Sequence, residues 1–192
     1  MDKNIFFSIP LFFLLVIGNF YFISFDKEFY LKEFKKYEIY SQFSNKEQVN
    51  QEFFKLLDYL QGKTSFLEST FFNQREKIHL QDVRKIYFSF QLLLSFSLLF
   101  TIFLTLYFKK QTIILLQLLQ QASILTFIFL LLLLFALLFN FQTIFIFMHK
   151  IFFTNNLWML DPATDNLIKL LPLEIFKDLA GIDRVISSRK SK

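Results

Sequence analysis

The sequence has no cysteine and contains only three glycines and three prolines among its 192 residues. Without cysteine, the chain can form neither a disulfide framework nor a cysteine-ligated zinc or iron–sulfur site, and it has no thiol nucleophile. The small number of glycines and prolines excludes collagen-like and low-complexity chains. Charge is also missing from three long stretches, which contain no Asp, Glu, Lys or Arg, and 54% of all residues are hydrophobic. These features exclude a secreted, disulfide-stabilised module and indicate an integral membrane protein.

The uncharged stretches cover residues 4–25, 86–108 and 111–149. Each reaches the length of about 20 apolar residues that a helix needs to cross about 30 Å of hydrocarbon. We therefore predict an all-α, polytopic membrane helical bundle that forms a single integral membrane domain over residues 1–192. Its three membrane-spanning helices are expected at residues 4–25, 86–108 and 123–147.

The third uncharged stretch is too long for one simple crossing of the bilayer. Near its beginning, Gln117, Gln120 and Gln121 lie close together on one face of a helix. A polar face of this kind favours a helix that lies in the membrane interface. Residues 111–121 are therefore expected to form a separate interfacial helix before the third span.

Three crossings place residues 26–85 and 148–192 on the same side of the membrane. Lys and Arg are more numerous near the span ends on that side, and the positive-inside rule then favours a cytoplasmic location. Long charged segments can nevertheless be translocated, so charge alone leaves the orientation open.

Residues 26–85 are expected to form amphipathic helices outside the membrane, because apolar side chains recur among charged ones at helical spacing. Ser44 and Glu47 have the spacing of a capping box, which predicts a helix that starts there and runs to about Leu60. Gly62 is expected to end that helix.

The only two histidines, His79 and His149, lie close to the ends of the second and third spans. Histidine is the side chain whose ordinary pKa lies near neutrality, which suits it to acid–base chemistry. Because both span ends emerge on the same side, we expect the two imidazoles to meet at the membrane–water interface.

Three ionisable residues surround His79 on its predicted helix. At about 100° per residue, Arg75, His79 and Asp82 fall on one stripe, with Glu76 beside it. A carboxylate one turn from an imidazole can fix its tautomer and raise its basicity, and an arginine can stabilise developing negative charge. The alternative is a juxtamembrane salt-bridge stripe whose histidine simply lies in the interface.

A second cluster of functional residue types follows His149, with Lys150, Trp158 and Asp161 close to the exit from the third span. A tryptophan at this position is typical of an interfacial aromatic belt. The sequence Asp161-Pro162, followed by Asp165, predicts a turn that leads into a helix with Asp165 as its N-cap.

Other chemistries lack their motifs in this sequence. It contains no Gly-rich phosphate loop, no H-E-x-x-H pattern and no G-x-S-x-G elbow. No metal is expected, because the histidines and carboxylates lack the spacing of a ligand set, although a metal-dependent membrane hydrolase is a lesser alternative. No nucleic-acid partner is expected, because no basic patch is interleaved with aromatic residues outside the spans.

Three elements of the sequence resemble the lipoprotein intramolecular transacylases (Lit) of bacterial membranes. Leu56 to Gly62 is similar to the family's Tyr-Leu-x-Gly element. The central element reads Phe72-Asn73-x-Arg75-Glu76-x-x-His79-x-x-Asp82-Val83. The C-terminal signature is matched by His149, Phe152, Phe153, Trp158, Asp161, Pro162, Asp165, Leu167, Ile168, Pro172 and Glu174.

The resemblance implies a four-helix membrane enzyme with its site at the outer face of the cell membrane. The implied reaction moves the sn-2 acyl chain of a diacylglyceryl-cysteine lipoprotein to the α-amino group of that cysteine, giving a lyso-form lipoprotein. This O-to-N acyl transfer requires no cofactor, and its partners are diacylglyceryl lipoproteins and membrane lipids. The loops 26–85 and 148–192 would then be extracytoplasmic.

The resemblance also implies roles for individual residues. It assigns catalytic roles to His79, His149, Asp82, Arg75 and Glu76, and substrate-binding roles to Lys150, Trp158 and Asp161. Either histidine can be the base, and Asp82 would orient His79. Arg75 and Glu76 would bind or polarise the ester or amine region.

The chain departs from the family pattern at its C-terminal end. The family continues into a fourth membrane helix, whereas residues 173–192 are rich in charge and are not expected to span the bilayer. We therefore expect this chain to lack the fourth helix, and a partner chain or an oligomer could supply the missing wall. A non-catalytic or degenerate member of the same family is the main alternative to an acyltransferase.

Overall fold

The computed structural model describes residues 4–181 of the chain. Its described elements are α1 (Asn4–Ser24), α2 (Lys27–Lys36), the 3-10 helix η1 (Ile39–Gln42), α3 (Lys46–Leu60), α4 (Gln74–Tyr107), α5 (Thr112–Phe152), α6 (Asn166–Leu170) and α7 (Leu173–Leu179). The predicted all-α fold is confirmed. Of residues 173–192, which are not expected to span the bilayer, Leu173–Leu179 form the short α7, and residues 182–192 lie outside the described residues.

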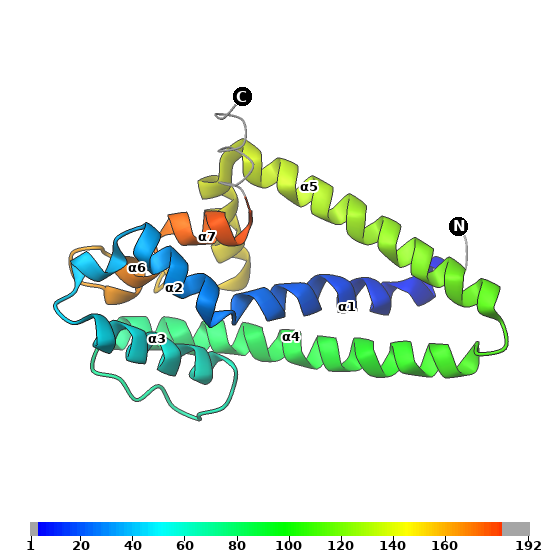
Figure 1. Cartoon of the computed structure of the whole chain (residues 1–192), viewed down its shortest axis with the longest axis horizontal. Helices are drawn as coiled ribbons and strands as arrows, with labels where there is room; N and C mark the ends of the chain where they lie inside the picture. Colours follow the sequence, from blue (N-terminus) through cyan, green and yellow to red (C-terminus); the bar gives the residue numbers. More distant parts are fainter. Residues whose placement is uncertain (1–3, 182–192) are drawn as a thin grey trace. The chain divides into compact units, whose positions relative to one another are not determined.

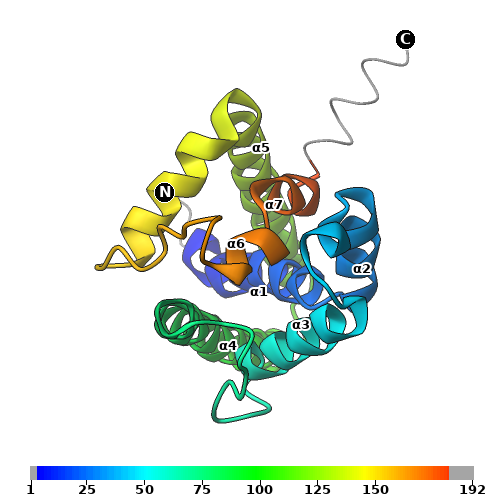
Figure 2. The same cartoon turned by 90° about the vertical axis from the view of Figure 1, so that its left-hand side faces the viewer.

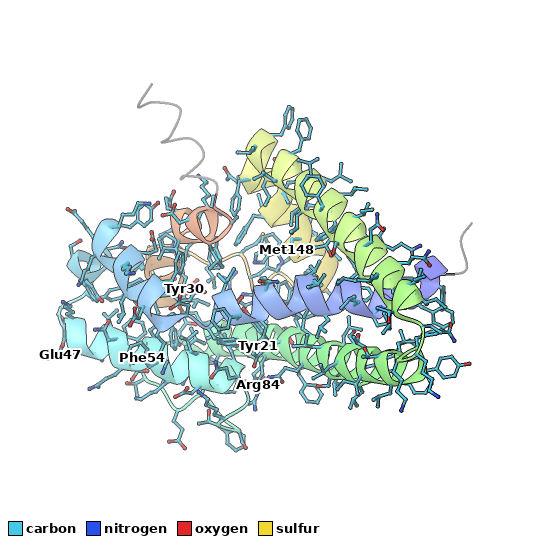
Figure 3. All side chains as sticks on the ribbon, turned by 45° about the vertical axis from the view of Figure 1, so that its right-hand side comes forward. Tyr21, Tyr30, Glu47, Phe54, Arg84 and Met148 are labelled. Carbon is cyan, nitrogen blue, oxygen red and sulfur yellow. The ribbon has the colours of Figure 1, made fainter. Side chains whose placement is uncertain are left out.

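Three helices are long and apolar enough to cross a membrane, as predicted. They are Phe6–Ser24, Gln74–Tyr107 and Thr112–Phe152, with mean hydropathies of 2.1, 1.9 and 2.9 in their most apolar windows. Figure 3 shows side chains projecting away from the ribbons along most of α4 and α5. Many of these are large apolar groups, and Phe139 is 87% exposed. Apolar side chains exposed in this way are stable in hydrocarbon, as expected of membrane-spanning helices.

The prediction of a separate interfacial helix at residues 111–121 is wrong. Helix α5 begins at Thr112 and continues through Gln121 and Ala122 without a break. In an apolar environment an interrupted helix leaves backbone groups unpaired, and no glycine or proline in this part of α5 favours an interruption. Within α5, non-helical backbone angles occur instead at Asn140, with φ −159° and ψ 88°.

The chain divides into two compact units, and neither is continuous in sequence. One unit combines α1 with residues 89–136, and the other combines residues 25–88 with the chain that follows Leu137. In the first unit, the Gln91 amide donates a hydrogen bond of 2.6 Å to the Tyr21 hydroxyl, joining α1 to α4. Both histidines belong to the second unit.

The second unit has an aromatic core. In Figures 1 and 2, α2, α3, α6 and α7 gather around the first turns of α4. The fully buried rings of Phe34 and Phe53 lie 5.0 Å apart, and Leu170 of α6 and Ile175 of α7 belong to the same buried cluster. This core holds the C-terminal helices against the beginning of α4. The amphipathic helices expected outside the spans are thus packed on one another.

The ends of α3 test the predicted caps. The helix starts one residue later than expected, because Asn45 is its N-cap and the Asn45 side chain accepts hydrogen bonds from the backbone N–H groups of Glu47 and Gln48. The capping box predicted with Ser44 is therefore wrong. The helix ends at Leu60, and Gly62 follows with a positive φ of 81°, as expected for a residue that ends a helix.

Helix α7 is joined to α2 by a pair of acidic side chains. Asp178 is 3% exposed, forms an ion pair with Lys36 and accepts a hydrogen bond of 2.9 Å from the Tyr37 hydroxyl. Burial raises the pKa of Glu33 to about 7, and its hydrogen bond with Asp178 adds to this increase. Burial also acts to raise the pKa of Asp178, but its hydrogen bonds from Glu33, Lys36 and Tyr37 lower the pKa by more. Glu33 is therefore the protonated partner below pH 7.

Replacing Glu33 with glutamine should stabilise the protein at pH 8 more than at pH 5. Because the pKa of Glu33 is higher in the folded state than its ordinary value, stability is lost as the pH rises through about 7. Glutamine keeps a hydrogen-bond donor towards Asp178 at every pH. We expect the melting temperature of the purified protein to rise at pH 8 and to stay nearly unchanged at pH 5. The control is Glu68→Gln, which changes an exposed glutamate. An equal shift of the melting temperature at both pH values, or the same pH pattern in Glu68→Gln, would contradict a protonated Glu33 beside Asp178.

Candidate active site

The two histidines meet in an aromatic cluster, as the sequence predicts. The ring centroids of His79 and His149 lie 6.3 Å apart, with an angle of 30° between the rings. Phe153 contacts both, at 4.9 Å from His79 and 5.5 Å from His149. The two histidines are 6% and 9% exposed. The last turns of α5 and the first turns of α4 thus bring together two acid–base groups that are 70 residues apart in sequence.

The tautomer of neutral His149 follows from one backbone contact. Its Nδ1 lies 2.7 Å from the carbonyl oxygen of Phe145, one helical turn earlier in α5. A carbonyl oxygen can only accept a hydrogen bond, so Nδ1 is the protonated nitrogen and donates. The other ring nitrogen, Nε2, then carries a lone pair. The Phe145 ring packs on the imidazole at 4.3 Å, which fixes its orientation.

His79 has no comparable hydrogen bond. Its Nδ1 is buried and has no hydrogen-bond partner within residues 4–181. The expected contact with Asp82 is not formed, because the Asp82 carboxylate accepts instead from Lys85 at 2.8 Å and from the Asn155 side chain at 2.9 Å. Asp82 therefore acts on His79 only through its charge.

Arg75 holds the loop that follows α5. Its guanidinium donates to the backbone oxygens of Asn156 at 3.3 Å and Met159 at 2.5 Å. The guanidinium is thus bound to carbonyl groups, where the expectation was a contact with the substrate ester. Together with the bond from Asn155 to Asp82, this contact fixes the loop that carries Trp158. The indole of Trp158 lies 5.0 Å from the His149 ring.

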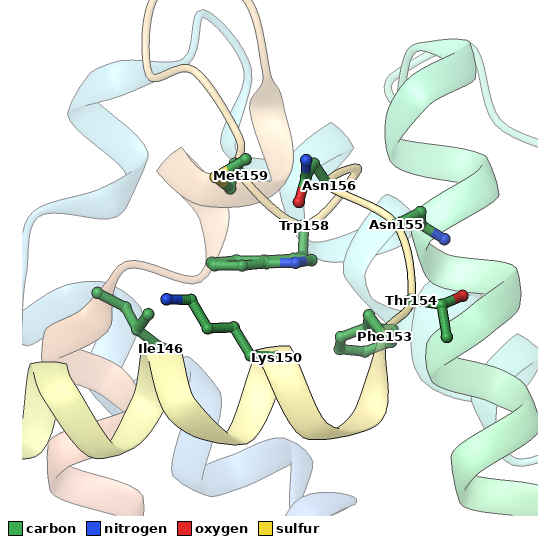
Figure 4. Close-up of a pocket in the computed structure, with 8 residues that line it drawn as sticks. All are labelled: Ile146, Lys150, Phe153, Thr154, Asn155, Asn156, Trp158 and Met159. Carbon is green, nitrogen blue, oxygen red and sulfur yellow. The ribbon is translucent and has the colours of Figure 1, made fainter.

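A cavity of about 580 Å³ opens beside this loop. It is lined by Ile146, Lys150, Phe153, Thr154, Asn155, Asn156, Trp158 and Met159. Figure 4 shows the Lys150 side chain extending along the face of the Trp158 indole, with Phe153 at the other end of the cavity. Because Phe153 and Trp158 also contact the histidines, the cavity adjoins the His79–His149 pair. Two of the predicted substrate-binding residues, Lys150 and Trp158, therefore line one cavity.

Glu76 has a structural position that the sequence interpretation missed. Its side chain is fully buried, and its two oxygens accept from the backbone N–H groups of Asn73 at 2.6 Å and Leu167 at 2.5 Å. The Asn73 side chain accepts in return from the Glu76 N–H at 3.0 Å. Asn73 and Glu76 thus form a capping box at the start of α4. Both Glu76 oxygens are thus used in folding contacts, a role that the Asn-x-x-Glu spacing could have indicated, and the contact of Glu76 with the ester or amine stays a prediction.

Asp161 and Asp165 shape the turn before α6. The Asp161 side chain accepts from the Ala163 N–H at 2.9 Å, which confirms the predicted turn. Asp165 is the N-cap residue of α6, as predicted, although its side chain makes no capping hydrogen bond. Burial acts to raise the pKa of Asp165, but hydrogen bonds from the Asp161 N–H, the Asn73 amide and the Thr164 hydroxyl lower it by more. Asp161 therefore holds the turn, and its expected role in the substrate wall is not visible in its contacts.

The residues at the site do not form a metal-ligand set. Among residues 4–181, no group of three or more His, Cys, Asp or Glu side chains is placed to hold a metal ion.

Comparison with known proteins identifies the family. Residues 5–176 match the family described as "Lipoprotein intramolecular transacylase Lit". The chain belongs to the Lit family. Its structure is similar to that of the membrane integral lipoprotein intramolecular transacylase Lit from Bacillus cereus, with a TM-score of 0.78 and 26% sequence identity over 93% of this chain and 81% of that chain. A variant of the Bacillus cereus protein, in which a histidine is replaced by arginine, gives a TM-score of 0.72 and 25% identity over 93% and 80% of the two chains.

Comparison with curated proteins finds no significant match. Membership of the Lit family nevertheless agrees with the three apolar helices and makes the chain an integral membrane protein of a transacylase family. The residues that match the family extend from α1 to α7, so both histidines and the cavity lie inside the Lit match.

Proposed function

We propose that this Lit family member transfers the sn-2 acyl chain of a diacylglyceryl-cysteine lipoprotein to the α-amino group of the same cysteine. The observation that carries this proposal is the pair of histidines, 6.3 Å apart, beside a cavity at the end of two membrane spans. The substrate's acyl chains remain in the bilayer, so its reacting groups lie at the membrane surface. A site at the ends of α4 and α5 matches that position.

His149 is the proposed base. An α-amino group has an ordinary pKa of about 7.7–8.0, and its nitrogen must be unprotonated to attack an ester. Because Nδ1 of His149 donates to Phe145, Nε2 is available to accept the proton that the attacking amine loses. A new C–N bond forms as the amine adds to the ester carbon.

His79 is the proposed acid. Its Nδ1 has no partner within the described chain, so this nitrogen can carry the lone pair while Nε2 carries the proton. When the ester C–O bond breaks, the sn-2 oxygen takes that proton and becomes a hydroxyl. Transfer of the proton from His149 to His79 then restores both rings. Both reacting groups belong to one substrate molecule, so the protein acts mainly by holding them together.

Lys150 and Trp158 are the proposed contacts for the developing oxyanion and the glyceryl group. Both line the cavity next to His149, and an ammonium or an indole N–H can donate to an oxyanion. Arg75 is unsuited to this role because backbone carbonyls already bind its guanidinium. Arg75 and Asp82 are better assigned as residues that position the loop carrying Trp158.

The proposed reaction also requires an orientation in the membrane. Mature lipoprotein amino termini lie outside the cytoplasm, so the second unit with its histidines would face outwards. Residue 66 lies in this unit and Phe66 is 78% exposed. Because the chain has no cysteine of its own, a Phe66→Cys variant provides a single labelling site.

The function is tested by supplying a synthetic diacylglyceryl-cysteinyl peptide to the purified chain in lipid vesicles. The product has the same mass as the substrate, so fragmentation spectra must show the acyl chain on the N-terminal residue, and the free amine must disappear. In cells, a membrane-impermeant maleimide should label Phe66→Cys. A folded chain that gives no N-acyl product would favour the non-catalytic alternative, and a Phe66→Cys variant accessible only from the cytoplasm would contradict lipoprotein acylation.

A further inference from the structure

The break in α5 at Asn140 divides this helix into two segments. Asn140 has extended backbone angles, φ −159° and ψ 88°, within a helix that otherwise runs from Thr112 to Phe152. Its side-chain oxygen accepts a hydrogen bond of 3.0 Å from the Thr143 N–H. This bond from residue N3 to the side chain of an extended residue is the geometry of an N-cap. Asn140 therefore starts a new helical segment that runs to Phe152.

The position of this break is unusual for its surroundings. From Ala122 to Phe139 the helix contains no residue more polar than Ser123 and Thr126. A break there leaves N–H groups without helical partners, which is costly in an apolar environment. The Asn140 carboxamide satisfies one of these groups. An asparagine in the first span, Asn19, donates instead to the Leu15 carbonyl within α1, so an asparagine in a span does not by itself break a helix.

The segment that Asn140 starts carries the proposed base. His149 lies nine residues after Asn140, near the end of the segment. Between them, Phe145 provides the carbonyl that accepts from His149 Nδ1, and its ring packs against Phe176 of α7 at 5.4 Å. The cap at Asn140 holds the first turn of this segment, and Phe145, which orients the His149 ring, lies in the next turn.

We infer that Asn140 is a positioning residue for His149, and that its N-cap sets the rotation that points the base towards the reacting amine. This inference rests on the proposed transfer reaction and adds the residue that aligns its base. Asn140 is not among the residues that line the cavity. Its effect on the reaction passes through Phe145 and the backbone of the segment.

The test compares Asn140→Ala, which removes the cap, with Asn140→Ser, which keeps a capping oxygen. Loss of an N-cap typically costs a free energy that corresponds to a change of about 5- to 10-fold in an equilibrium or rate. We expect Asn140→Ala to lower kcat about 5- to 10-fold with less than about a 2-fold change in KM for the diacylglyceryl peptide, and Asn140→Ser to retain at least about half of kcat. The control Asn19→Ala should match the unchanged protein. An unchanged kcat in Asn140→Ala, or equal losses in Asn140→Ala and Asn140→Ser, would overturn the inference.

A second readout is independent of activity. The chain has only two histidines, so ¹⁵N spectra of histidine-labelled protein contain only two imidazole systems. We expect His149 to show the Nδ1-protonated tautomer in the unchanged protein and in Asn140→Ser, and a mixture of tautomers in Asn140→Ala. A tautomer unaffected by Asn140→Ala would reject the positioning role. If the unchanged chain is inactive but the shift occurs, the proposed reaction is rejected and the positioning role is retained.

Discussion

Replacing His149 with alanine should lower N-acylation of the diacylglyceryl peptide by about 10²- to 10⁴-fold, the usual contribution of a positioned general base. The substitution removes Nε2, which is the ring nitrogen left free by the bond from Nδ1 to Phe145. The attacking amine then has to lose its proton to water. The rate is measured from fragmentation spectra of the peptide at increasing reaction times.

The matched control for this substitution is His149→Asn. The asparagine side-chain NH₂ can take the place of Nδ1 and still donate to the Phe145 carbonyl, but it provides no base. We expect His149→Asn to melt close to the unchanged protein and to be as inactive as His149→Ala. Substantial activity in His149→Asn would show that the imidazole is not the base and would move this role to His79.

Replacing Glu76 with alanine should lower the free energy of unfolding by about 2–4 kcal/mol. The buried Leu167 N–H loses its partner, which costs about 1–3 kcal/mol, and loss of the capping box at α4 costs about 1 kcal/mol. The Glu76 carboxylate accepts from the N–H groups of Asn73 and Leu167 and is fully buried. Alanine removes these two contacts and so weakens the start of α4 and one of the contacts that hold α6. The melting temperature in detergent or lipid should therefore fall.

Glu76→Gln separates this structural role from a catalytic one. The amide oxygen of glutamine can accept a hydrogen bond from one of the two N–H groups, while its NH₂ faces the other. We therefore expect Glu76→Gln to lose stability, but less than Glu76→Ala. The activity that remains should follow the fraction of folded protein. A Glu76→Ala variant with an unchanged melting temperature and no activity would instead support the catalytic role suggested by the sequence.

The Phe72–Val83 element therefore combines two kinds of residue. Of these residues, only His79 belongs to the histidine pair, whereas Arg75 binds the loop of Trp158 and Glu76 binds the start of α6. These contacts explain how a short run of sequence aligns parts of the chain that lie about 80 to 90 residues further on. A change in this element can thus abolish activity through chemistry or through folding.

The sequence alone determined that the chain has three apolar spans, where α3 ends, and that the two histidines meet. The uncharged runs predict three membrane helices, because charged side chains are costly in hydrocarbon. The end of α3 at Leu60 was also readable, since Gly62 supplies the positive φ that a helix end uses. The convergence of His79 and His149 followed from topology, because both span ends emerge on one side of the membrane.

Tertiary structure decided which polar atoms are paired and which remain free. Periodicity placed Asp82 beside His79, but Asn155 from a distant loop binds that carboxylate. Spacing placed Arg75 and Glu76 near the reaction, but the backbone of residues 156–167 binds both side chains. Helical spacing determines only which side chains lie on the same face of a helix. A polar group bonds to the donor or acceptor that packing brings within reach, and that neighbour depends on how segments far apart in sequence fold together.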